Sequence, residues 1–206
     1  RVWIGVCRGR GGGWGRRVWG GGRGTMPLGQ QNAGAEAPSQ LDLAAERGCD
    51  FTDTAEMYPV PARAETSGET ERIVGNWLAR QAREKLVIAT KVAGPARSLE
   101  WIRGGPLALA RANIRAAVEG SLRRLRTDYI DLYQTHAFDP ETPIDETLRA
   151  LDDLVRAGKV RTVGCSNSVA YKHLTLPTSD LESISVVAVY LKKKKRTGHT
   201  ALRHQC

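Results

Sequence analysis

The chain has 206 residues, a length typical of one domain, and its formal net charge of +9 suggests a nucleic-acid or membrane-surface partner until the charge is located. Residues 1–24 carry six arginines and no acid, residues 171–206 carry a net charge of +5, and residues 25–170 carry eighteen basic residues against twenty acidic ones. The excess charge therefore belongs to the two ends, and the middle has the composition of an ordinary globular domain.

The first segment, residues 1–23, is rich in Gly and Arg with three interspersed tryptophans, and it has no periodic apolar face. Such a composition predicts a disordered leader. The arginine charge and the stacking of the tryptophans could bind single-stranded nucleic acid. We favour instead an unstructured leader, or sequence upstream of a true start near Met26.

Helices and strands are expected to alternate between the two ends, from periodicity and from capping residues. Ser39 can cap a short helix that ends at Gly48. A helix over residues 69–84 comes next, followed by one that Pro106 opens and one that Pro143 opens and Gly158 ends. The expected strands cover residues 49–53, 86–90, 129–133 and 160–164.

The last segment, residues 170–206, differs from the middle in composition. It contains a Ser/Thr/Pro stretch, a strand-like run at residues 184–191 and five consecutive basic residues at 192–196. The apolar run is far shorter than the roughly twenty residues that cross a bilayer, so no membrane partner is expected. We interpret the charge run as a solvated basic tail.

Alternating strands and helices predict a parallel sheet with helical crossovers, either an open doubly wound sheet or a closed barrel. The middle has no Gly-x-Gly-x-x-Gly motif. Polar residues instead follow the carboxyl ends of several strands: Asp53, Lys91, His136, Ser166 and Asn167. Such ends meet at the mouth of a (β/α)8 barrel, which favours that fold.

The four cysteines lie far apart, with no Cys-x-x-Cys pair and no histidine at a metal-ligand spacing. This pattern predicts neither a metal site nor a disulfide framework, and it favours a reducing, cytoplasmic location.

Four residues at these strand ends suit proton transfer to a carbonyl oxygen, although each alone has an ordinary structural explanation. A free tyrosine has a pKa near 10, and we expect the Lys91 charge to lower the pKa of Tyr58 toward the working range. Asp53 would keep Lys91 charged and oriented, and His136 would hydrogen-bond the substrate oxygen. No side chain donates hydride, so a reductase would need a cofactor.

Several collinear motifs resemble the aldo-keto reductase family, closest to its bacterial Tas-type branch. They include Gly-Thr-Met-Pro-Leu-Gly at residues 24–29, Asp-Thr-Ala-Glu-Met-Tyr at 53–58, Asp-Tyr-Ile-Asp-Leu-Tyr at 128–133 and Gly-Cys-Ser-Asn at 164–167. Shorter matches lie at residues 68–71, 75–78, 83–91 and 121–125, and His136 also fits. The resemblance covers about residues 24–168.

The resemblance implies a (β/α)8 barrel that reduces aldehydes and ketones with NADPH, without metal or flavin. It implies that Tyr58 is the general acid, that Lys91 and Asp53 lower its pKa, and that His136 orients the carbonyl. It assigns the cofactor to Gly24, Thr25, Met26, Asp53, Ser166 and Asn167, and the substrate pocket to Glu56 and Met57.

The family's pattern does not continue after Val169. We therefore expect a barrel truncated to about its first five β/α units over residues 24–169, between disordered ends foreign to the family. The predicted function is NADPH-dependent reduction of small carbonyl compounds, impaired or absent in such a fragment. The alternatives are a non-catalytic cofactor-binding subunit and, less favoured, nucleic-acid binding through the basic ends. The substrate, the preference for NADPH over NADH and the oligomeric state are not predicted.

Overall fold

The computed structural model of the chain describes residues 3–4, 23–30, 36–96, 99–105, 107–166 and 186–190, with side chains for all but the first and last of these ranges. In chain order the elements are β1 (Trp3–Ile4), β2 (Arg23–Gly24), α1 (Glu36–Glu46), β3 (Phe51–Asp53), α2 (Glu69–Leu78), a 3-10 helix (Arg83–Lys85), β4 (Val87–Val92), α3 (Arg111–Leu125), β5 (Ile130–Thr135), α4 (Ile144–Arg156), β6 (Val160–Cys165) and β7 (Val186–Tyr190).

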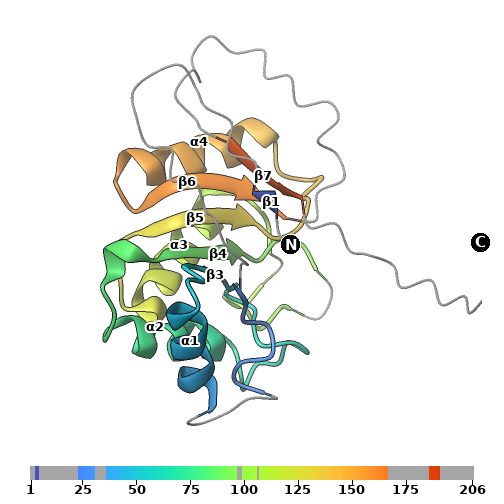
Figure 1. Cartoon of the computed structure of the whole chain (residues 1–206). Coiled ribbons are helices and arrows are strands. Elements are labelled where there is room, and N and C mark those ends of the chain that lie inside the picture. The colour runs from blue at the N-terminus through green and yellow to red at the C-terminus, as the bar shows by residue number, and fades with distance from the viewer. Residues whose placement is uncertain are drawn as a thin grey trace, which may run out of the picture.

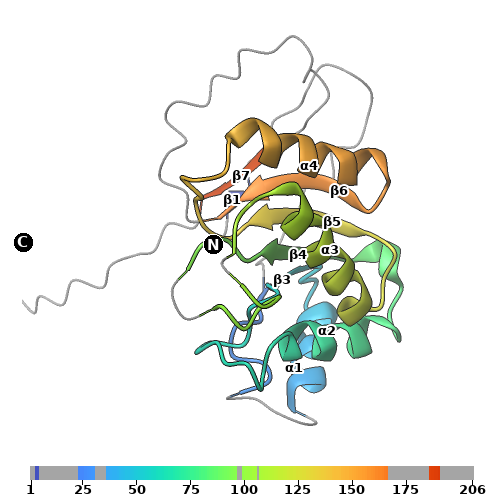
Figure 2. The same ribbon diagram turned by 180° about the vertical axis from the view of Figure 1, so that it is seen from behind.

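The strands form one sheet in the order β1-β7-β6-β5-β4-β3-β2. Each strand from β2 to β6 pairs in parallel with the next one in the chain. Each helix contacts the following helix, and the four are ranged along the sheet from α1 at the bottom to α4 at the top (Figures 1 and 2). A doubly wound sheet reverses its strand order at a switch point, whereas a barrel keeps sequential order. The described strands therefore follow the predicted (β/α)8 pattern.

Strands also occur in both end segments. The strand-like run of the tail forms β7, parallel to β6. β1 pairs antiparallel with the other side of β7, in a leader for which the sequence predicts no regular structure. The free edge of a strand offers unpaired N–H and C=O groups to any extended segment nearby, which accounts for this short pairing.

Helix starts differ from the sequence predictions at two places. Helix α1 begins at Glu36, so Ser39 lies inside the helix and does not cap it. Helix α3 begins at Arg111, after the start predicted at Pro106, which lies outside the described residues. The backbone before α3 is held by tertiary contacts, because Leu109 donates to Asp139 Oδ2 (2.6 Å) and accepts from the Thr147 hydroxyl (2.8 Å).

The end of α2 also differs, because the helix stops at Leu78 and a separate 3-10 helix follows. Arg83 in that 3-10 helix donates to the carbonyls of Leu86 and Tyr129 and to the Asp131 carboxylate. These bonds hold the chain in a turn that leads into β4. Two other predicted boundaries are confirmed, since Pro143 directly precedes α4 and Gly158 follows it with a left-handed φ of 71°.

The two faces of the sheet bury different sets of residues. The main core lies between sheet and helices and includes Trp77, Ile88, Ile114, Leu125 and Tyr133. A smaller cluster on the opposite face is formed by Phe51, Ala89 and Leu132. Because side chains alternate across a strand, the residues two positions further along each of these strands share that second face.

Candidate active site

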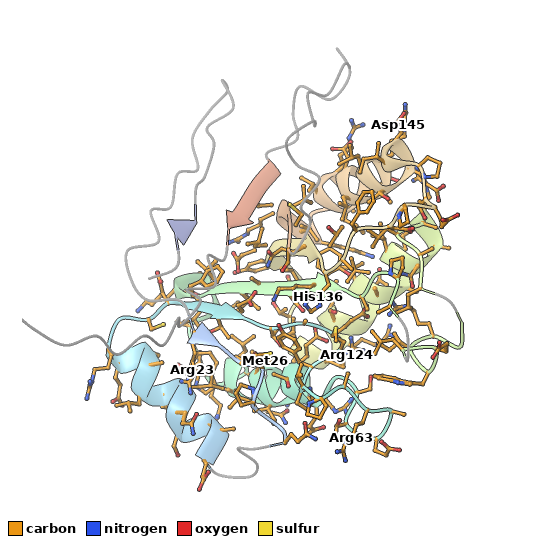
Figure 3. All side chains as sticks on the ribbon, turned by 90° about the vertical axis from the view of Figure 1, so that its right-hand side faces the viewer. Arg23, Met26, Arg63, Arg124, His136 and Asp145 are labelled. Carbon is orange, nitrogen blue, oxygen red and sulfur yellow. The ribbon has the colours of Figure 1, made fainter. Side chains whose placement is uncertain are left out.

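The inner face of the sheet changes from apolar to polar toward the carboxyl ends of the strands. Two residues beyond Phe51, Ala89 and Leu132, the same face carries Asp53, Lys91 and Gln134. His136 follows at the end of β5, and Figure 3 shows it at this end of the sheet together with Met26, which follows β2. Strand periodicity thus places a polar layer on top of an apolar one.

Lys91 is the centre of this polar layer. Its side chain is 2% exposed, and its Nζ donates to both Asp53 carboxylate oxygens (2.7 Å each) and to the Thr54 carbonyl (2.9 Å). All three ammonium donors therefore have acceptors. Burial lowers the pKa of Lys91, and the Asp53 carboxylate opposes that shift. The bidentate contact with Asp53 is what keeps a buried ammonium charged.

Tyr58 lies against both Lys91 and His136. The Lys91 Nζ is 5.3 Å from the centroid of the Tyr58 ring, and the Tyr58 and His136 ring centroids are 5.7 Å apart in an edge-on arrangement at 75°. The chain reaches this position by a turn after β3, in which the Tyr58 N–H donates to the Ala55 carbonyl (3.0 Å). Three separate segments thus bring Tyr58, Lys91 and His136 together.

The expected lowering of the pKa of Tyr58 is wrong for this arrangement. Burial raises the pKa of Tyr58 to about 12, and the Asp53 charge adds to the shift. Burial is the larger cause, because it disfavours the charged tyrosinate, and the nearby Asp53 carboxylate also repels a tyrosinate. Tyr58 is therefore a neutral hydroxyl at neutral pH, with its proton available to an acceptor.

His136 is also neutral at physiological pH. Burial and the nearby Lys91 charge lower the pKa of His136 to about 4. Its Nδ1 is buried and has no hydrogen-bond partner among the described residues. A neutral imidazole carries one N–H donor, so this side chain can hydrogen-bond an oxygen without carrying a charge.

The residues assigned to a cofactor by resemblance differ in their burial and in their hydrogen bonds. Thr25 is buried, and its N–H and hydroxyl both donate to the Asp53 carbonyl (3.1 and 2.9 Å), so they join the end of β2 to the end of β3. A Cβ added at Gly24 would meet no described atom within 4 Å, and Met26 is 47% exposed. Ser166 is buried directly after β6. Asn167 lies outside the described residues.

Gln134 is a site residue that the sequence analysis missed. It is buried, its Nε2 donates to Asp53 Oδ1 over 3.4 Å, and its Oε1 has no partner among the described residues. Its position two residues before His136 on an alternating strand was a usable signal.

The Glu56 side chain, which the resemblance assigns to the substrate pocket, is buried in an ion pair with Arg103. Arg103 lies in the connection between β4 and α3, where no sequence pattern marked it. Met57 packs on an apolar cluster that includes Leu99 and Ile102.

Comparison with known proteins decides the family. The model of the aldo/keto reductase family matches residues 22–192. This chain belongs to the aldo/keto reductase family. The match extends past the predicted limit at residue 168 and includes β7.

The relatives of this aldo/keto reductase include Tas-type proteins. Protein tas of Escherichia coli K12 is 46% identical over 170 residues, which cover 73% of this chain and 49% of that protein. An uncharacterized oxidoreductase of Bacillus subtilis, YrpG, is 37% identical over 174 residues, or 84% of this chain and 52% of that protein. The chain spans about half the length of these curated relatives.

A solved structure supports the same fold. The aldo-keto reductase AKR11C1 from Bacillus halodurans, in its holo form, matches with a TM-score of 0.58 and 36% sequence identity, covering 70% of this chain and 45% of that one. Within the described ranges, no helix is long and apolar enough to cross a membrane. The same residues contain no group of three His, Cys, Asp or Glu side chains that could hold a metal ion.

Proposed function

We propose that this chain carries the catalytic half of an NADPH-dependent carbonyl reductase, which converts aldehydes or ketones to alcohols. The observation that carries the proposal is the position of a neutral Tyr58 against Lys91 and His136, with Asp53 paired to Lys91. Membership of the aldo/keto reductase family supports the same reaction class.

Tyr58 would donate the proton that completes the reduction. A carbonyl oxygen that gains negative charge is a stronger base than a tyrosinate, so a hydroxyl with a pKa of about 12 can still protonate it. When the proton leaves, the Lys91 ammonium stabilises the tyrosinate that remains. Asp53 keeps that ammonium charged and in place.

His136 would orient the substrate. Its imidazole is neutral and lies at the edge of the Tyr58 ring, so a hydrogen bond from its N–H can direct the carbonyl oxygen toward the Tyr58 hydroxyl. A neutral donor has a further advantage, because it does not compete with Tyr58 as a stronger acid would.

Two observations support a nicotinamide cofactor at these residues. A Cβ added at Gly24 would meet no described atom within 4 Å, so a ligand can approach the backbone there, and the Gln134 Oε1 has no partner among the described residues, which leaves an acceptor in the same polar layer. Gly24, Thr25, Met26, Asp53, Ser166 and Asn167 are the residues proposed to hold it. When bound, NADPH supplies the hydride. We propose NADPH as the cofactor, a small carbonyl compound as the substrate and a cytoplasmic location on the basis of the family and the sequence.

The test follows the loss of NADPH absorbance with a generic aldehyde. We expect Tyr58→Phe to abolish turnover. Tyr129→Phe is the matched control, because Tyr129 stacks between Arg83 and Arg161 at the opposite end of the strands. Full turnover in Tyr58→Phe would contradict the proposed role of Tyr58 as the general acid. The measured rate also tests the impairment predicted from the sequence, and NADPH binding without any turnover would favour a non-catalytic cofactor-binding subunit.

A further inference from the structure

A buried ion pair lies directly beside the segment that carries Tyr58. The Glu56 carboxylate is 2% exposed and accepts two bonds from the Arg103 guanidinium, Nη1 to Oε2 at 2.5 Å and Nη2 to Oε1 at 2.9 Å. The Ala93 N–H is a third donor to the same carboxylate. Both oxygens of Glu56 are therefore engaged, and two of the three donors come from Arg103.

Glu56 fixes the segment after β3 onto β4. Beyond the end of β3, Thr54 N–H donates to the Ala89 carbonyl (2.9 Å) and Glu56 N–H donates to the Lys91 carbonyl (3.3 Å), which continues the parallel ladder. At the next step the Glu56 side chain takes the place of the backbone and accepts from Ala93. Tyr58 follows two residues later, so the contact between Glu56 and Ala93 fixes the backbone close to the Tyr58 ring.

Arg103 is itself held at a defined position. It has a left-handed backbone with φ of 57°, and its Nε donates to Asn113 Oδ1 (2.6 Å) in the first turn of α3. The neighbouring Ile102 packs with Leu99 in an apolar cluster against which Met57 also packs. The connection between β4 and α3 thus contacts Glu56 through an ion pair and Met57 through apolar packing.

We propose that Arg103 is a positioning residue, which acts through Glu56 to hold the Tyr58 ring against Lys91 and His136. Replacing a buried ion pair by apolar residues often costs no stability, so its presence next to a site is better explained by the geometry it imposes. The bidentate guanidinium fork sets both the distance and the orientation of the Glu56 carboxylate. This inference rests on the proposed carbonyl reduction, in which the placement of Tyr58 matters.

The test compares Arg103→Gln and Glu56→Gln with the unmodified chain by NMR, without cofactor or substrate. We expect both variants to weaken the ring contact between Tyr58 and His136. We also expect water to reach His136, which should raise its pKa from about 4 by roughly one unit or more toward the usual 6.5. Glu56→Gln separates geometry from charge, because it leaves no unpaired carboxylate near the imidazole and keeps an oxygen for Ala93.

Arg83→Gln is the matched control, since Arg83 also pairs with a largely buried carboxylate, that of Asp131, at the amino ends of the strands. It should leave the His136 titration unchanged. In the reductase assay, Arg103→Gln should lower kcat by about tenfold or more with little change in KM, and Arg103→Lys should recover part of that loss.

An unchanged ring contact and an unchanged His136 titration in folded Arg103→Gln would overturn the proposal. If Arg103→Gln does not fold, Glu56→Gln decides by the same two signals. Absence of turnover in the unmodified chain would bear on the proposed function alone, because the NMR measurements do not depend on catalysis.

Discussion

The buried, neutral His136 predicts a specific dependence of stability on pH. In the folded chain its pKa is about 4, whereas an unfolded histidine has a pKa near 6.5. Below pH 6.5 the unfolded chain therefore binds a proton that the folded chain does not take up until about pH 4. The stabilisation that His136 contributes is fully present above pH 6.5 and is lost as the pH falls from 6.5 to 4.

The size of the effect follows from the two pKa values. A shift of one pKa unit corresponds to 1.36 kcal/mol, so the whole shift is worth about 3 kcal/mol. Between pH 7.5 and pH 5 the expected loss in the free energy of unfolding is about 2 kcal/mol. Loss on this scale is a substantial fraction of the stability of a typical domain.

Urea unfolding of the chain and of His136→Gln at pH 7.5, 6 and 5 measures this term. Other groups titrate in the same range, but they are common to both proteins and cancel in the difference. We expect the unmodified chain to lose about 2 kcal/mol more than His136→Gln over this range. Equal losses in the two proteins would show that His136 is not held neutral by its surroundings.

Three further predictions concern other parts of the molecule. A double-mutant cycle on Asp53→Asn and Lys91→Met, measured by urea unfolding, should give a coupling energy of about 3 kcal/mol, because either single change leaves a largely buried group unpaired. A coupling energy below about 1 kcal/mol would contradict the ion pair. Tyr58 should contribute no tyrosinate absorbance below about pH 11, as judged from the difference between the chain and Tyr58→Phe, and ionisation near pH 10 would contradict its burial. Gly75→Ala should lower the free energy of unfolding by about 3 kcal/mol, because the added Cβ would lie 2.1 Å from a backbone oxygen of α3. In Gly105→Ala the added Cβ meets no described atom within 4 Å, so the free energy of unfolding should change by no more than about 0.5 kcal/mol. Equal thermal midpoints for the two variants would contradict the close contact between α2 and α3.

Local sequence signals predicted most of the helices and strands of the middle of the chain and marked the polar residues that follow several strands. Strand and helix alternate as the apolar periodicity predicts, and the polar residues after three strands lie together because the carboxyl ends of parallel strands meet at one edge. Gly158 and Pro143 marked helix limits because their backbone preferences are intrinsic to the residue.

Helix starts that depend on distant contacts could not be predicted in this way. The segment before α3 stays extended because Asp139 and Thr147, some thirty to forty residues away in sequence, take its backbone groups. The choice between a doubly wound sheet and a barrel also required the strand order, which no local pattern contains.

The sequence by itself determined which residue types lie at the carboxyl ends of the strands, since that follows from periodicity along each strand. Only the tertiary structure decided how these residues affect one another. The pKa of Tyr58 rises because the ring is buried and the Asp53 charge lies close to it. The Glu56 carboxylate is buried against Arg103, a partner 47 residues later that donates to both of its oxygens. Burial and pairing are properties of the assembled fold, so electrostatics and side-chain direction become fixed only when the elements pack.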